Sequence, residues 1–105
     1  MRFLETPVFT RLATKLWDDD EYQVLQLALL VRPTLGPVIP RSGGLRKMRW
    51  SQSGAGKRGG IRVIYFWDEP SETVYMLYVY RKGVQGDLTP RQVRVLGRLV
   101  REEFG

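Results

Sequence analysis

Two runs with strand-like alternation flank a basic, glycine-rich loop, and this arrangement constrains the fold more than any other feature of the chain. The runs are Leu45–Trp50 and Ile61–Trp67. We interpret both as half-buried strands, in which successive side chains point to opposite faces with a period of two. If the runs pair, Lys47, Arg49 and Arg62 meet on one face of a sheet. The sequence therefore predicts a hairpin with a strongly basic face.

The loop between these runs adds to the basic character of the hairpin. Residues 51–60 contain four glycines together with Lys57 and Arg58, and no Asp or Glu occurs between Tyr22 and Trp67. A loop of this composition is either a flexible connection or a segment that lies close to a phosphate backbone. Positive charge without a nearby partner favours a polyanion as ligand, and phosphate is the usual one.

Length and composition exclude several classes of protein. The 105 residues suit a single domain spanning 1–105, and the formal charge of +6 favours nucleic acid, an acidic protein or an anionic surface as partner. The alternative is a basic soluble domain with no such partner. The chain has no cysteine and no histidine, which excludes disulfides, thiolate or imidazole metal sites and histidine acid–base chemistry. We expect neither a metal site nor a cofactor.

The N-terminal part of the chain carries no targeting or membrane signal that we recognise. Arg2 is followed by a charged, amphipathic segment, and the longest apolar region, Leu25–Val31, is far too short to span a bilayer. We therefore expect a cytoplasmic protein without membrane contact. Residues 18–21 are all acidic, and we interpret them as the capped first turn of a helix, with a catalytic cluster as the less favoured alternative.

The remaining segments complete an α+β pattern. Arg2–Glu5 is a possible edge strand, helices are predicted from Pro7 and over about Glu21–Val31, and Thr73–Lys82 is the third long strand. A last helix begins at Thr89, which has a capping-box spacing to a glutamine. The predicted order is βααβββα, with an antiparallel sheet and helices packed on one face. The other face, which carries the basic residues, is expected to be uncovered or only partly covered.

Simple alternation assigns the side chains of the third long strand to two faces. Tyr75, Leu77 and Val79 are expected on one face, and Met76, Tyr78, Tyr80 and Lys82 on the other. Most of these tyrosines are expected to serve packing. Tyr80 and Lys82 are exceptions because they lie at the strand's end, where side chains reach an open face. The last helix presents an arginine stripe that is either solvated or a surface for an acidic partner or nucleic acid, namely Arg91, Arg94, Arg98 and Arg101.

Nearly the whole chain resembles the RelE/HigB family of toxins from type II toxin–antitoxin systems, and its HigB-type branch most of all, and two segments carry most of the resemblance. They are IPRSGGLRKMRWSQSGAGKRGGIRVIYFW and VYMLYVYRKGVQGDLTPRQVRVLGRLV. The resemblance implies the family's small microbial-RNase-like domain. It also implies a metal-independent endoribonuclease, an mRNA interferase that cuts mRNA in the A site of the 70S ribosome and so inhibits translation. In this reaction the 2′-OH attacks the neighbouring phosphate, leaving a cyclic phosphate and a free 5′-OH.

The resemblance also implies roles for individual residues and for a partner. Arg62 matches the family's strand arginine that contacts the scissile phosphate, Lys82 matches a basic residue at the end of the last strand, and Tyr80 lies beside them. A neighbouring antitoxin, a helix-turn-helix DNA-binding protein, is the implied partner. The residues that the resemblance implies for binding RNA phosphates are Lys47, Arg49, Lys57 and Arg58.

Two other functions remain open at this point. A related branch, ParE, poisons gyrase without nuclease activity, and a non-catalytic RNA-binding module is a third possibility. The dense basic set on the sheet favours the nuclease. Because we expect no carboxylate on the basic face, catalysis would rest on positive charge. The candidate proton acceptors for the 2′-OH are Lys47, Lys57, Lys82 and Tyr80, and we expect neighbouring cations to lower the pKa of Tyr80.

Overall fold

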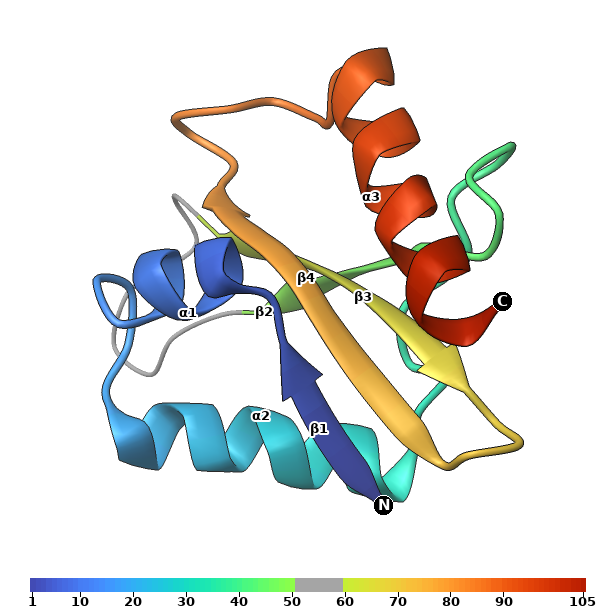
Figure 1. Ribbon diagram of the computed structural model, residues 1–105. Coiled ribbons are helices and arrows are strands. Elements are labelled where there is room, and N and C mark those ends of the chain that lie inside the picture. Colours follow the sequence, from blue (N-terminus) through green and yellow to red (C-terminus); the bar gives the residue numbers. More distant parts are fainter. Residues whose placement is uncertain (51–59) are drawn as a thin grey trace.

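The computed structural model describes residues 1–50 and 60–105, which form three helices and one four-stranded sheet (Figure 1). The α+β class expected from the sequence is confirmed. In chain order the elements are β1 (Arg2–Glu5), α1 (Pro7–Ala13), α2 (Asp19–Val31), β2 (Arg46–Trp50), β3 (Ile61–Asp68), β4 (Thr73–Arg81) and α3 (Pro90–Phe104).

The sheet is mixed and has the strand order β1-β4-β3-β2. The three long strands are antiparallel neighbours, as expected, but β1 runs parallel to β4. The expectation of a purely antiparallel sheet is therefore wrong at this edge. Between β1 and β4 the chain forms two helices and the strands β2 and β3, and a connection of that length permits parallel pairing where a tight turn does not.

Helices cover both faces of the sheet, whereas the sequence led us to expect them on one face. On one face, Phe9 of α1 and Leu25 of α2 belong to the same buried cluster as Val63 of β3. On the other face, Leu96 of α3 belongs to a second cluster with Ile64 of β3. Figure 1 shows α3 crossing the side of the sheet opposite α2. The basic face is therefore only partly open, because α3 covers its other end.

An irregularity in β4 changes which side chains share a face. Ile64 pairs with Tyr78 but the next residue, Tyr65, pairs with Met76, so Leu77 is an extra residue opposite β3. Beyond this bulge the alternation is reversed. Val79 therefore lies in the cluster beneath α1 and α2, not with Leu77 as simple alternation predicted.

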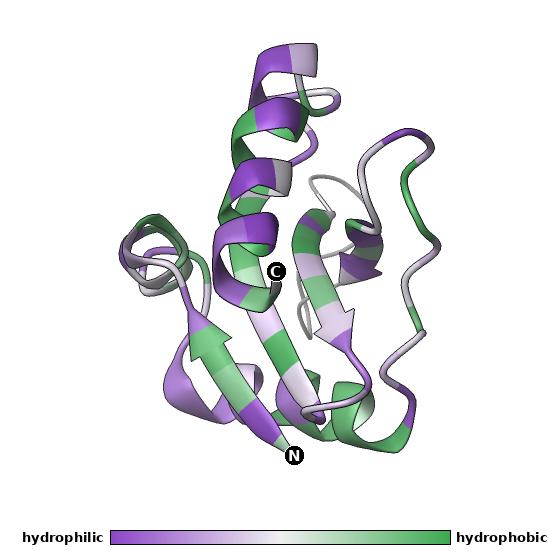
Figure 2. Ribbon diagram, turned by 45° about the vertical axis from the view of Figure 1, so that its right-hand side comes forward, coloured by the Kyte–Doolittle hydropathy of each residue, from purple (hydrophilic) through white to green (hydrophobic). Residues whose placement is uncertain are grey.

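Local capping explains where the two longer helices begin. At α2, the Glu21 N–H donates to Asp18 Oδ1 at 2.8 Å and the Asp18 N–H donates to Glu21 Oε1 at 3.2 Å. This capping box confirms the interpretation of the acidic cluster as a helix start. At α3, Thr89 and Gln92 form the same arrangement. Figure 2 shows bands of hydrophilic and hydrophobic residues along α3, as expected of a helix with one buried face.

No helix within residues 1–50 and 60–105 has the length and the apolar character needed to cross a membrane.

Candidate functional site

The pairing of β2 with β3 brings the predicted basic residues together. Arg49 lies opposite Arg62, and Lys47 lies opposite Ile64, so all three basic side chains project from the face that also carries α3. Like charges directly across a strand pair are ordinarily unfavourable. An anion that binds between these side chains offsets their repulsion.

These side chains open into a pocket of about 560 Å³. Lys82 joins them from the loop that follows β4, where its N–H donates to the Gly60 carbonyl oxygen at 3.0 Å. Four residues predicted from the sequence, Lys47, Arg49, Arg62 and Lys82, therefore line one pocket. Its walls are formed by Leu35, Pro37, Met48, Trp50, Gly86 and Asp87.

A close approach of two backbones holds the wall formed by the segment before β2. A side chain at Gly36 would place its Cβ only 3.0 Å from the Lys47 carbonyl carbon, so glycine is needed for this contact. The Gly36 N–H donates to the Tyr65 hydroxyl at 2.9 Å, and that hydroxyl donates to the Pro33 carbonyl at 2.7 Å. The Lys47 N–H also donates to the Pro37 carbonyl at 3.1 Å. The wall is thus tied to the strand that carries Lys47.

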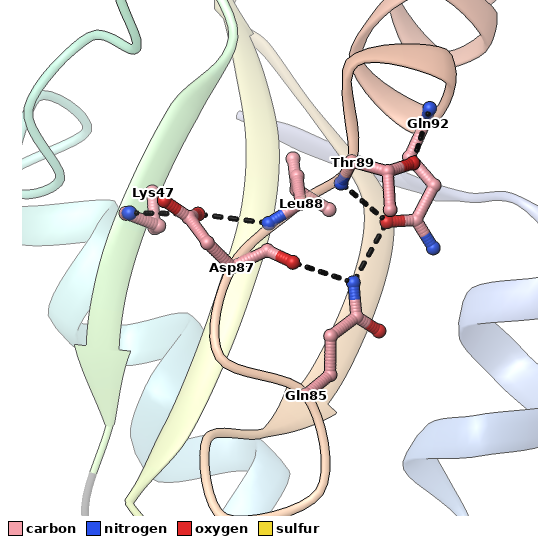
Figure 3. A network of polar contacts seen from close by, with 6 residues as sticks. All are labelled: Lys47, Gln85, Asp87, Leu88, Thr89 and Gln92. Atoms are coloured by element: carbon pink, nitrogen blue, oxygen red, sulfur yellow. Dashed lines mark hydrogen bonds and ion pairs between the residues drawn. The ribbon is translucent and has the colours of Figure 1, made fainter.

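An acidic residue that sequence reasoning missed also lies in the pocket. Lys47 Nζ donates to Asp87 Oδ1 at 3.1 Å, as Figure 3 shows. The expectation that no carboxylate lies on the basic face is therefore wrong. Asp87 lies 40 residues further along the chain than Lys47, in the loop between β4 and α3. One signal could have found it, since it is the only acidic residue between Glu72 and Glu102.

Further hydrogen bonds fix the position of the Asp87 loop. The same Asp87 Oδ1 accepts from the Leu88 N–H at 2.8 Å. The Gln85 side-chain amide donates to the Asp87 carbonyl at 2.9 Å and to Gln92 Oε1 at 2.7 Å, which connects the loop to the first turn of α3 (Figure 3). Tyr78 completes the network by donating to Gln85 Oε1 at 3.1 Å. Asp87 is therefore held at the rim by the α3 cap.

The ion pair at the rim of the pocket is accessible to solvent. The Lys47 and Asp87 side chains are 34% and 69% exposed. The pKa of Asp87 is lowered from its ordinary value, first by the Leu88 N–H and then by the hydrogen bond from Lys47. Exposed pairs of this type contribute at most about 1 kcal/mol to stability. A bound anion can therefore replace Asp87 as the partner of Lys47 with little loss of stability.

Tyr80 lies beneath the basic cluster and not in its pocket. The residue pairs with Arg62 in the sheet but is only 6% exposed, and its hydroxyl has no hydrogen-bond partner among the described residues. Burial raises the pKa of Tyr80, and the Asp87 carboxylate raises it further, against a lowering by Arg62. The expectation of a lowered pKa is wrong, because loss of hydration and the unexpected carboxylate outweigh the nearby arginine.

The last two residues predicted to bind phosphate, Lys57 and Arg58, lie outside the described residues. Across the described ranges, no group of three or more acidic side chains is arranged to hold a metal ion. The pocket thus offers two guanidinium groups, two ammonium groups and one carboxylate. A guanidinium group can donate two parallel hydrogen bonds to the oxygens of one phosphate. Guanidinium and ammonium groups also stabilise the negative charge that develops on phosphate during reaction.

No protein-family model matches the chain.

Proposed function

We propose that the protein is the toxin of a type II toxin–antitoxin system, with a RelE-like domain that cuts mRNA on the 70S ribosome. The observation that carries the proposal is the pocket in which Lys47, Arg49, Arg62 and Lys82 converge from two strands and a loop. Within the described residues, only one carboxylate lines this pocket, and it is exposed. The pocket therefore keeps a net positive charge that suits the phosphodiester of RNA.

The proposed reaction is attack of a 2′-OH on the adjacent phosphate, with departure of the 5′-oxygen. Arg62 binds the non-bridging oxygens of the scissile phosphate and stabilises the charge that they gain in the transition state. The Lys82 ammonium protonates the departing oxygen. Lys47 and Arg49 hold the RNA backbone on β2. No metal ion or cofactor enters this mechanism.

The Trp50 side chain belongs to the opposite face of β2, where it packs against the cluster beneath α1 and α2. The pocket side of β2 therefore offers RNA the charges of Lys47 and Arg49. A pocket open to solvent does not by itself hold the RNA in line for attack. We propose that the ribosomal A site supplies this geometry, which requires a cytoplasmic protein.

The test is expression of the chain, followed by mapping of RNA ends and a reaction with programmed ribosomes. We expect translation arrest and cuts within coding regions, with a cyclic phosphate upstream of each cut. The Arg62→Ala variant should lose the cuts, whereas Arg11→Ala, an exposed arginine on α1, should keep them. Intact mRNA with broken DNA would indicate gyrase poisoning, and RNA binding without cleavage would indicate a non-catalytic module.

A neutralising antitoxin is part of the same proposal, with a helix-turn-helix DNA-binding protein as its expected class. The exposed arginines of α3 lie on the outer side of that helix and suit an acidic partner surface. Copurification with the product of an adjacent gene tests this part. Changing Arg94 and Arg98 to Glu should weaken capture at moderate salt while the fold persists. Unchanged capture by that variant would exclude α3 as the docking surface.

A further inference from the structure

The proposed reaction needs a group that accepts the proton of the 2′-OH, and the basic residues of the pocket are poor acceptors. Guanidinium groups do not release a proton at any pH at which proteins function, and an ammonium group must first lose its own. Tyr80 is buried below the pocket, and its pKa is raised. Residues 51–59 contain no Asp, Glu or His. Among the groups that line the pocket, this leaves the carboxylate of Asp87.

We propose that Asp87 is the general base of the cleavage reaction, an inference that rests on the proposed nuclease function. One carboxylate oxygen, Oδ1, is held by Lys47 and by the Leu88 N–H at 3.1 and 2.8 Å. The other oxygen makes no hydrogen bond within the described part of the chain. It is therefore available to a substrate hydroxyl in the pocket that Asp87 shares with Arg62 and Lys82.

The step balances with groups that the pocket contains. Asp87 accepts the proton of the 2′-OH as the 2′-oxygen forms a bond to phosphorus. The bond from phosphorus to the 5′-oxygen breaks, and Lys82 gives a proton to that leaving oxygen. After the step Asp87 is protonated and Lys82 is neutral. Asp87 then releases its proton to water and Lys82 takes one from water, which restores both groups. No oxidant, metal or external acid is required.

The position of Asp87 is fixed independently of substrate, as a catalytic base requires. The Gln85 side-chain amide donates hydrogen bonds to the Asp87 backbone carbonyl and to Gln92 in the α3 cap (Figure 3). These bonds fix the loop, and with it the Asp87 carboxylate, relative to α3. The charged and titratable groups around the pocket that holds it are Lys47 and Arg49 from β2, Arg62 from β3 and Lys82 from the loop after β4, with Tyr80 buried below. The Leu88 N–H, and after it the neighbouring lysines, lower the pKa of Asp87, so the carboxylate is ionised at neutral pH.

A simpler role for Asp87 is that of a counter-ion that holds Lys47 and competes with RNA for it. The two roles predict opposite effects of Asp87→Asn. Asparagine keeps the shape and can still accept from the Leu88 N–H, but it cannot take a proton. If Asp87 is the base, single-turnover cleavage on preformed ribosome complexes falls by about 10²–10⁴-fold, as for loss of general-base catalysis elsewhere. If it is only a counter-ion, cleavage is unchanged or faster.

Binding separates these effects from damage to the pocket. Affinity for a short single-stranded RNA should be equal or higher in Asp87→Asn, since a negative charge is removed. The loss then appears in the rate at saturation and not in binding. Asp20→Asn, an exposed residue in the first turn of α2, is the matched control and should cleave like the parent. Asp87→Glu should recover part of the rate, because it restores a carboxylate.

The pH profile provides the deciding measurement. The parent should cleave at a nearly constant rate between about pH 6 and 9, because its base is already ionised. Asp87→Asn should instead accelerate by about tenfold per pH unit, as hydroxide replaces the missing base. An Asp87→Asn protein that cleaves like the parent, with the same flat profile, overturns the proposal while the nuclease function stands. A parent protein that cleaves no RNA with ribosomes present overturns the proposed function itself.

Discussion

Arg49 and Arg62 lie directly opposite each other across β2 and β3, with their side chains on the same face of the sheet. Within the described residues, neither arginine has a carboxylate partner, since the ion pair of this pocket joins Lys47 to Asp87. Two like charges in cross-strand register destabilise a sheet. We infer that this pairing lowers the stability of the free protein in favour of anion binding.

Replacement of Arg49 by threonine tests this relationship. Threonine fits a strand well, and removal of the facing charge should stabilise the free protein by about 0.2–1 kcal/mol. RNA binding should weaken in the same variant, and both effects should shrink as salt is raised. Denaturant unfolding and RNA titration measure the two quantities. Arg81→Thr, at the exposed end of β4, is the control. A less stable Arg49→Thr protein would contradict the inferred repulsion.

A second prediction concerns Arg62 and Lys82 as a catalytic unit. Each change to alanine should slow cleavage by about 10²–10³-fold, because each removes a donor that stabilises transition-state charge. The double variant should be little worse than either single one, since residues that act together on one phosphate are not additive. Single-turnover rates on ribosome complexes measure this. Multiplicative losses would mean that the two residues act at different steps or on different phosphates.

The unpaired hydroxyl of Tyr80 predicts that removing it does no harm to the fold. A buried hydroxyl without a partner costs about 1–3 kcal/mol, so Tyr80→Phe should be at least as stable as the parent. In a domain of this size, 1 kcal/mol corresponds to a rise in Tm of about 4–8 °C. Thermal unfolding by circular dichroism measures the change. If cleavage also survives, Tyr80 is not the proton acceptor. If Tyr80→Phe instead has a raised Tm but cleaves about 100-fold more slowly, Tyr80 takes part in catalysis.

Three tyrosines that lose hydration on folding, one fully and two partly buried, predict loss of stability in alkaline solution. Burial raises the pKa of Tyr22, Tyr65 and Tyr75, and for Tyr22 a hydrogen bond to Glu5 at 2.6 Å adds to the shift. A pKa that is raised in the folded state gives stability that is complete below the unfolded value, near ~10, and is lost as pH rises above it. The free energy of unfolding should therefore decrease above about pH 10.

Denaturant unfolding at several alkaline pH values tests this prediction, together with the ultraviolet absorbance of tyrosinate. The part of the absorbance change that is missing in Tyr22→Phe should increase in step with unfolding and not before it. Tyr22→Phe should show a shallower decrease of stability with pH than the parent, whatever its stability at neutral pH. If this Tyr22 signal appears near pH 10 while the protein is still folded, the assignment of Tyr22 to a desolvated position is contradicted.

Much of the local structure follows from the sequence. The alternation of β2 and β3 correctly put Lys47, Arg49 and Arg62 on one face, because side-chain direction in a regular strand depends only on position along it. The capped starts of α2 and α3 were also readable, since the groups that satisfy a helix end lie within three residues of it. The resemblance to a toxin family remains a prediction.

The tertiary structure decided features that depend on contacts between distant segments. The extra residue Leu77 puts the rest of β4 on the opposite faces from those that alternation predicts, and no local sequence pattern predicts such a bulge. The side of the sheet that α3 covers depends on how its apolar stripe fits Ile64 and Leu77. Asp87 reaches Lys47 only because the β4–α3 loop folds back over β2. Periodicity determines which way a side chain points, whereas packing determines what it meets.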